Sequence, residues 1–277
     1  MTVEAENEWR TISKNDKKRI ARGPKKKAAL NYAKESQIQG PQQGTHMPAS
    51  ELERVISQCQ LEIESTKFFA AVEEMVLRVP PPLGIVCYGI GNFGGTQSTP
   101  SASLWQLAFA LQLRNIFQKQ GLEITMYYFE PFMTSEEEVL LEHLSIRIIR
   151  ENERGKRVVT ERTFFFMPHC PLVLYSNLLF ENRDNLQNLV IVGNSLLAYA
   201  NRLQKNCHTL FLQTLRPFWC ETTVSIPHDE VSQLSAQFER AFNDQAVISF
   251  TDTQDLELSE DLVAKMIRES ETSDEVV

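Results

Sequence analysis

Three glycines, Gly89, Gly91 and Gly94, follow a short apolar run with the spacing G-x-G-x-x-G. Glycine allows a sharp turn and lets backbone N–H groups approach an anion, as the first strand-to-helix turn of a nucleotide-binding α/β fold requires. The spacing therefore predicts a loop whose free amides face a ligand cavity. Residues 95–99 separate the third glycine from the predicted helix, whereas the dinucleotide fingerprint runs straight into its helix, and this weakens the phosphate-binding interpretation.

Glu130 is a second candidate, because it directly follows the apolar run 124–129. An acidic residue at this strand tip holds ribose hydroxyls in nucleotide-binding sheets. The alternative is that Glu130 only begins the loop to the next helix, whose start is marked by Ser135 and Glu138 with the spacing of a capping box.

His169 and Cys170 could supply a general base and a thiol nucleophile. Adjacent side chains on an extended segment point to opposite sides, so we do not expect the two to act on each other. The alternative is that His169 bonds a loop carbonyl while Cys170 packs as a small apolar residue. Cys170-Pro171 also matches a dipeptide of some haem-responsive proteins, but Pro171 equally suits the start of a helix.

Metal-ligand residue types occur at two places, His169-Cys170 and Cys207-His208. Neither pair has the spacing of a structural zinc site, so we predict no metal site.

Gly193, Asn194 and Ser195 close the apolar run 189–192. Their amide and hydroxyl groups could orient a polar ligand. Ser195 equally suits the N-cap of the following helix, and both roles are compatible because a helix N-terminus presents N–H groups to anions.

The elements that position these residues are predicted from hydrophobic period and turn residues. The helix after the glycines should begin at Pro100, with Ser98 or Thr99 as its cap. The alternation of strands and helices favours one Rossmann-like α/β domain, with a mostly parallel sheet covered by helices on both faces. Ligands bind such sheets at the carboxyl ends of the strands, where the candidates fall. We predict helices over 52–77, 100–117, from 135 onward and from 195 to 202, and strands over 85–88, 124–129, 145–149, 157–160, 163–167, 189–192, 209–212 and 247–250.

Charge divides the 277-residue chain into three parts. Residues 1–50 hold ten Lys or Arg against five Asp or Glu, and most of these cations lie in 14–27. We predict a disordered basic tail over 1–50, the α/β domain over 51–250 and an acidic tail over 251–277, with a possible short helix near its middle. The basic tract is either a nuclear-import signal or a solvated tail, and any weak nucleic-acid contact is confined to it because the remainder is acidic.

The five cysteines form no Cys-x-x-Cys pair, and the chain begins with charged residues where a signal peptide would be apolar. No uninterrupted apolar run approaches about 18 residues. We therefore expect reduced thiols, a cytoplasmic or nuclear location and no membrane span.

Several spaced motifs follow one another between residues 79 and 250: Tyr88-Gly-Ile-Gly-Asn-Phe93, Ser103 with Gln106, Glu130-Pro131, Asn152-Glu153, Met167-Pro-His-Cys170, Leu174-Tyr175 with Asn177, and Gly193-Asn194-Ser195 with Tyr199. Together they resemble the SRR-like family, named for plant "sensitivity to red light reduced", in its animal type. The resemblance implies an intracellular regulatory protein linked to circadian clock input and, in animals, to control of haem biosynthesis. It brings no established catalytic activity.

Two hypotheses of different class remain. The first is a non-catalytic regulatory protein that binds a protein partner or a small nucleotide-like ligand. It rests on the resemblance and on the lack of an assembled acid, base and nucleophile. The second is an enzyme dependent on a nucleotide or S-adenosylmethionine, and it rests on the glycines and Glu130. We favour the first, leave the cofactor unidentified and predict no catalytic residue. The candidate ligand-binding residues are Gly89, Gly91, Asn92, Ser103, Gln106, Glu130, His169, Cys170, Gly193, Asn194 and Ser195.

Overall fold

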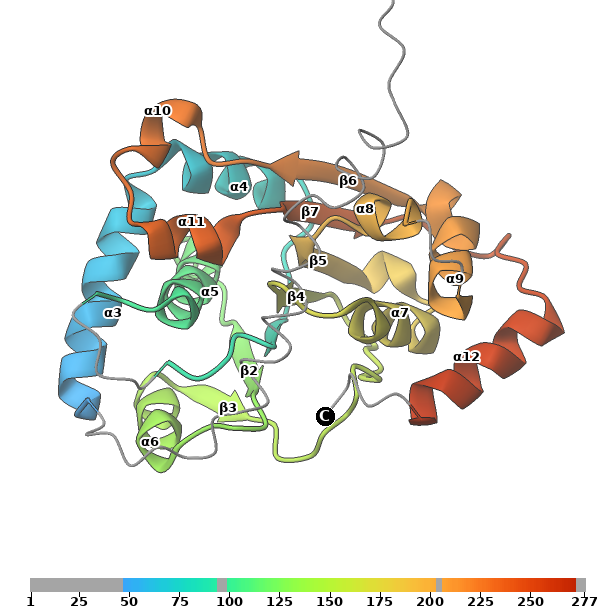
Figure 1. Cartoon of the computed structure of the whole chain (residues 1–277), viewed down its shortest axis with the longest axis horizontal. Coiled ribbons are helices and arrows are strands. Elements are labelled where there is room, and N and C mark those ends of the chain that lie inside the picture. Colours follow the sequence, from blue (N-terminus) through green and yellow to red (C-terminus); the bar gives the residue numbers. More distant parts are fainter. Residues whose placement is uncertain (1–46, 94–98, 203–205, 273–277) are drawn as a thin grey trace, which may run out of the picture. The chain divides into compact units, whose positions relative to one another are not determined.

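The structure, a computed structural model, describes residues 47–93, 99–202 and 206–272 (Figure 1). The predicted basic tail up to residue 46, the third glycine Gly94 and the predicted cap Ser98 lie outside the described residues. None of the described helices combines the length and the hydrophobicity that crossing a bilayer requires.

A seven-stranded sheet in the order β3-β2-β1-β4-β5-β7-β6 forms the centre of the fold (Figure 1). β1 to β5 are mutually parallel, while β7 runs antiparallel to both β5 and β6. The prediction of a mostly parallel α/β sheet is thereby confirmed. The strands are β1 (Gly84–Tyr88), β2 (Thr125–Phe129), β3 (Ile146–Ile148), β4 (Thr163–Met167), β5 (Leu189–Asn194), β6 (Trp219–Val224) and β7 (Gln245–Phe250).

The strand order reverses at β1. From this strand the chain moves outward through β2 and β3 on one side, and then returns to β4 and β5 on the other. At such a reversal the loops after the two neighbouring strands diverge, and in open α/β sheets ligands bind there, outside the carboxyl ends. The loops after β1 and β4 are therefore the structural centre of the candidate site.

Helices cover both faces of the sheet. One hydrophobic core lies under α3, α4, α5, α6 and α11, and the other under α7, α8, α9 and α12. Two 3₁₀ turns, Leu186–Asn188 and Arg216–Phe218, complete the described elements. The helices are α3 (Ala49–Glu64), α4 (Lys67–Leu77), α5 (Ala102–Gln118), α6 (Ser135–His143), α7 (Leu172–Glu181), α8 (Leu196–Ala200), α9 (Cys207–Leu215), α10 (His228–Val231), α11 (Ala236–Phe242) and α12 (Glu260–Thr272).

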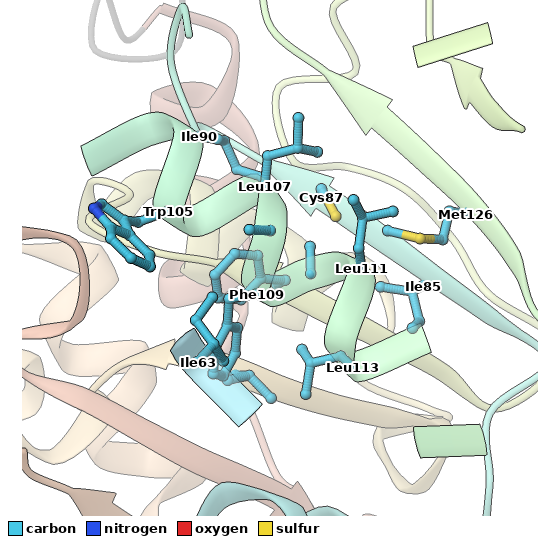
Figure 2. Close-up of a cluster of buried hydrophobic side chains, with 14 of the residues drawn as sticks. Ile63, Ile85, Cys87, Ile90, Trp105, Leu107, Phe109, Leu111, Leu113 and Met126 are labelled. Atoms are coloured by element: carbon cyan, nitrogen blue, oxygen red, sulfur yellow. The ribbon is translucent and has the colours of Figure 1, made fainter. Parts of the chain in front are cut away.

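α5 is the most deeply packed helix of the first core (Figure 2). Residues 104–113 are buried without a break, because the helix touches α3 and α11 as well as the sheet. The Phe109 ring makes tilted or edge-to-face contacts with four other phenylalanines, and Ile85 and Met126 meet the helix from β1 and β2. This packing fixes the start of α5 beside the glycine loop.

Three predicted helices differ from those of the structure. The single helix over 52–77 is two helices, because Thr66 accepts the Phe69 N–H and caps α4. α5 begins after Ser101, whose hydroxyl accepts the Leu104 N–H, so Pro100 precedes the helix. The capping box of α6 is formed one residue earlier than predicted, by Thr134 and Glu137.

Two predicted strands are wrong. Residues 157–160 form no ladder, since the Asn182 side chain bonds the Arg157 carbonyl and the Val159 N–H in place of a strand partner. Residues 209–212 lie in α9, which Asn206 caps through the Thr209 N–H.

One strand lies where none was predicted, and the helix predicted in the acidic tail packs on the core. β6 is a half-exposed edge strand whose sequence, Trp-Cys-Glu-Thr-Thr-Val, is not apolar enough to identify it. α12 falls in the predicted acidic tail, yet it buries Leu262 and Met266 in the second core. The folded part of the chain therefore continues past residue 250.

Candidate functional site

The sequence-predicted residues gather at the carboxyl ends of β1, β2, β4 and β5, and we call them the carboxyl-edge cluster. Ser103 and Gln106 join it from the first turns of α5. The cluster comprises Gly89, Gly91, Asn92, Ser103, Gln106, Glu130, His169, Cys170, Gly193, Asn194 and Ser195.

The glycine loop is held by Glu130. The Gly91 N–H donates to Glu130 Oε2 at 3.0 Å, and the Phe132 N–H donates to Oε1 at 3.3 Å. Burial raises the pKa of Glu130 from its ordinary value. Gly91 itself has φ +84°, and a Cβ there would lie 3.0 Å from Ser103 Oγ, so both conformation and space favour glycine.

A second carboxylate, that of Glu137, holds the rest of the loop. It accepts the Phe93 N–H, and its Oε2 accepts Asn92 Nδ2 at 3.0 Å and the Thr134 N–H at 2.8 Å. Glu137 is fully buried. The expectation of free amides is therefore wrong at Gly91 and Phe93. Their N–H groups already donate hydrogen bonds to the carboxylates of Glu130 and Glu137.

Cys170 closes the gap between β1 and β4. Its Sγ donates to the Tyr88 carbonyl at 3.4 Å, and a Cβ at Gly89, which has φ +66°, would lie 2.7 Å from this sulfur. Burial raises the pKa of the Cys170 thiol well above its ordinary value. A thiol that stays protonated is a poor nucleophile, so Cys170 packs here as a small apolar residue.

His169 is turned away from Cys170 and adopts φ +56°. Its Nε2 lies 2.9 Å from the Arg240 carbonyl and 3.2 Å from that of Ala241, at the end of α11. Because carbonyls only accept, Nε2 carries the proton. Burial lowers the pKa of His169, and Gln106 Nε2 donates to the same Ala241 oxygen at 3.0 Å. His169 therefore bonds backbone carbonyls, as the alternative interpretation expected, but they belong to helix α11 and not to a loop.

Asn194 joins the ends of β4 and β5. Its Oδ1 accepts the His169 N–H at 2.8 Å, and its own N–H donates to the Tyr175 hydroxyl at 2.8 Å. Asn194 Nδ2 donates to the Tyr199 hydroxyl at 3.1 Å, which in turn donates to the Cys170 carbonyl at 2.7 Å. Tyr175 and Tyr199 belong to the family motifs but not to the candidate site residues, and in the structure both hydroxyls bond Asn194 of the cluster.

Ser195 fulfils the predicted capping role in α8, accepting the Ala198 N–H at 3.0 Å. Its hydroxyl also donates to Glu221 of β6, whose Oε2 accepts the Leu197 N–H at 3.0 Å. Sequence analysis missed Glu221 because it missed the strand that carries it.

A further polar group borders the cluster. The Tyr88 hydroxyl donates to Glu153 Oε2 at 2.6 Å, and Arg157 binds the same carboxylate with two N–H groups at 2.9 and 2.8 Å. The Arg157 guanidinium also lies 5.1 Å from the centre of the Tyr127 ring. This bidentate pair fixes the loop after β3 against the end of β1.

Most of the reactive side chains of the cluster are hydrogen-bonded within the chain. The Cys170 thiol, the His169 imidazole and the Glu130 carboxylate are engaged by backbone groups. The Ser195 hydroxyl is bonded to the Glu221 carboxylate, which also accepts the Leu197 N–H. Gly89 and Asn92 are exposed, Glu130 is half-buried, and the Phe132 side chain beside them is 67% exposed. A cavity of about 740 Å³ lies at the opposite edge, where β2 and β3 begin, and none of the predicted residues lines it.

Comparison with known proteins gives consistent matches. A family model described as the SRR1 domain matches residues 68–249. An SRR1-like protein of Mus musculus is 39% identical over 121 residues, covering 43% of this chain and 46% of the relative. Protein SENSITIVITY TO RED LIGHT REDUCED 1 of Arabidopsis thaliana is 32% identical over 156 residues, covering 51% and 54%. An SRR1-like protein of Drosophila melanogaster is 29% identical over 149 residues, covering 51% of each.

The matched region spans about half the length of these curated relatives. Among solved structures, the SAH-bound Podospora anserina methyltransferase PaMTH1 aligns with a TM-score of 0.38 and 10% identity, covering 89% of this chain and 100% of that one. So distant a likeness supports no argument about activity.

Proposed function

Because this chain belongs to the SRR1 domain family, we propose that it is a non-catalytic regulatory protein that binds a ligand or protein partner through the carboxyl-edge cluster. The Arabidopsis relative carries a name that refers to reduced sensitivity to red light. The proposed role is regulation of circadian clock input, with control of haem biosynthesis as a further role that the family resemblance implies.

The observation that carries this proposal is that the side chains of Cys170 and His169 are hydrogen-bonded to backbone carbonyls. The Cys170 thiol donates to a strand carbonyl and stays protonated, and His169 Nε2 donates to the end of α11. An activated nucleophile needs a base within hydrogen-bond reach. These groups serve instead to hold loops in fixed positions, as a binding surface requires.

The exposed part of the surface has a mixed character. Asn92 offers an amide, Glu130 a half-buried carboxylate and Phe132 a largely exposed ring. Exposed aromatic residues beside polar groups are enriched in protein interfaces. A protein partner is therefore the favoured occupant.

We expect Phe132→Asp to abolish function. The test expresses the chain in Arabidopsis plants that lack the relative and measures their response to red light. The wild-type chain should restore the response, and Phe132→Asp should not, because a charge would replace the aromatic contact. Leu61→Asp is the matched control, since Leu61 is 63% exposed on α3. Rescue by both variants would refute the binding surface.

The proposed location is the cytoplasm or nucleus, and nuclear import rests on the basic tract 14–27. Tagged forms with and without residues 1–46 can be followed in the same plants. If the deleted form entered the nucleus as the full chain does, the proposal that the tract acts as an import signal would be refuted.

One observation favours the second candidate function, a nucleotide- or S-adenosylmethionine-dependent enzyme. Glu130 directly follows β2 and lies beside the glycine loop, at the reversal of strand order. In nucleotide-binding sheets an acid in this position accepts ribose hydroxyls. A ribose that took over the Glu130 carboxylate would release the Gly91 N–H toward the ligand.

A thermal-shift panel of ATP, NAD and S-adenosylmethionine separates the two candidates. A specific ligand at about 100 times its dissociation constant adds roughly 2.7 kcal/mol of stability. We expect no ligand of the panel to do so. Stabilisation by one of them that is lost in Glu130→Gln would favour the enzyme. Gly91→Val supplies a second check, because its side chain would meet Ser103.

A further inference from the structure

Three metal-ligand side chains converge away from the carboxyl-edge cluster. Cys207 and His208 begin α9, and Glu269 lies near the end of α12. Their ligand atoms all lie within 4.8 Å of one another, and His208 Nε2 is 3.5 Å from Glu269 Oε2. Figure 1 shows α12 beside α9, in agreement with the contacts between the two helices.

Local structure holds these residues in place. Asn206 Oδ1 accepts the Thr209 N–H at 2.8 Å, which fixes the first turn of α9. Cys207 and His208 are only 6% and 3% exposed. On α12, the fully buried Met266 precedes Glu269 by three residues, so both lie on the helix face that packs on the second core.

A hydrogen bond on the far side of the imidazole sets its tautomer. Ser176 Oγ donates to the Val173 carbonyl at 3.0 Å, and it lies 2.7 Å from His208 Nδ1. A hydroxyl has one proton, so while Ser176 donates to Val173 it accepts from Nδ1, and the imidazole proton is then on Nδ1. The basic nitrogen is then Nε2, on the side of Cys207 and Glu269. Metal-binding histidines typically show this arrangement.

We propose that Cys207, His208 and Glu269 bind one zinc ion, with water in the fourth position. Thiolate, imidazole and carboxylate are the three zinc ligand types, and three protein ligands with one open position make a common zinc site. Two ligands about 2.0–2.1 Å from a tetrahedral zinc lie roughly 3.4 Å apart, close to the 3.5 Å between His208 and Glu269.

Binding changes the state of the thiol. Burial and the neighbouring Glu269 raise the pKa of Cys207 to about 12, so the metal-free thiol is protonated. Zinc forms a bond to the sulfur and the thiol proton passes to solvent, so one proton is released at Cys207. The ion joins α9 to α12 and thereby fastens the last described helix to the domain.

The test titrates the full chain with zinc chloride by calorimetry and with cobalt(II) by absorption spectroscopy. We expect one site, with the charge-transfer band of a cobalt–thiolate bond and the visible bands of tetrahedral cobalt. Ser176→Ala should weaken zinc affinity about 10- to 100-fold, because it removes the partner that orients His208. Glu269→Gln should weaken it further, and Cys207→Ser should abolish the cobalt–thiolate band.

Cys220→Ser is the matched control, since this free cysteine is exposed on β6. It should leave zinc affinity and the cobalt bands unchanged. Zinc should also slow hydrogen exchange in α12, which ion binding elsewhere on the surface would not do. The proposal is overturned by absence of the cobalt–thiolate band, or by equal affinity in Glu269→Gln and the wild type. Glu269 is 44% exposed at its side chain, so its variant should fold even where a Cys207 variant does not.

Discussion

Gly193→Ala should destabilise the protein by about 3 kcal/mol, at the upper end of the usual cost of overpacking. Gly193 lies in β5, opposite Met167 of β4. A Cβ at this position would lie 2.5 Å from the Tyr175 hydroxyl and 2.8 Å from the Met167 carbonyl oxygen. The missing side chain is what allows the tyrosine hydroxyl to enter between the two strands. The free energy of unfolding in urea measures the effect.

Gly121→Ala is the matched control. Gly121 has φ +81°, but a Cβ there would meet nothing within 4 Å. Only backbone strain opposes this substitution, so its cost should be about 1 kcal/mol. Tyr175→Phe gives a second check, because removing the hydroxyl should relieve part of the clash in the double variant. Strictly additive costs in the double variant would contradict the proposed contact.

The sheet was largely predictable from sequence, because buried parallel strands are continuous apolar runs. Residues 85–88, 163–167 and 189–192 all fall in strands at nearly the expected bounds. β6 could not be found in this way, since an edge strand of an antiparallel pair carries polar residues. The run 209–212 has strand-like composition, but the Asn206 cap and burial against α7 and α12 make it helical.

The position of the site was predictable from sequence, but the side chains that bond its loop amides were not. A glycine loop at the end of β1 and an acid at the end of β2 must meet when the two strands pair in parallel. Glu130 lies 39 residues after Gly91, and Glu137 lies 44 residues after Phe93. No local sequence pattern indicates that these carboxylates bond the N–H groups of the loop. The sequence predicts no metal site at Cys207 and His208 because the pair lacks the spacing of a structural zinc site. Glu269 lies more than 60 residues further along the chain and approaches the pair only through the packing of α12.

Glu137→Ala should cost about 3 kcal/mol and loosen the glycine loop. The buried carboxylate accepts the Phe93 and Thr134 N–H groups together with the Asn92 amide. Each buried donor left without an acceptor costs about 1–3 kcal/mol. Urea unfolding measures the total, and faster hydrogen exchange of the Phe93 amide localises it. Glu138→Ala is the matched control in the same helical turn, because its pair with Arg150 is largely exposed and worth at most about 1 kcal/mol. Equal costs for the two variants would show that the carboxylate of Glu137 does not hold the loop.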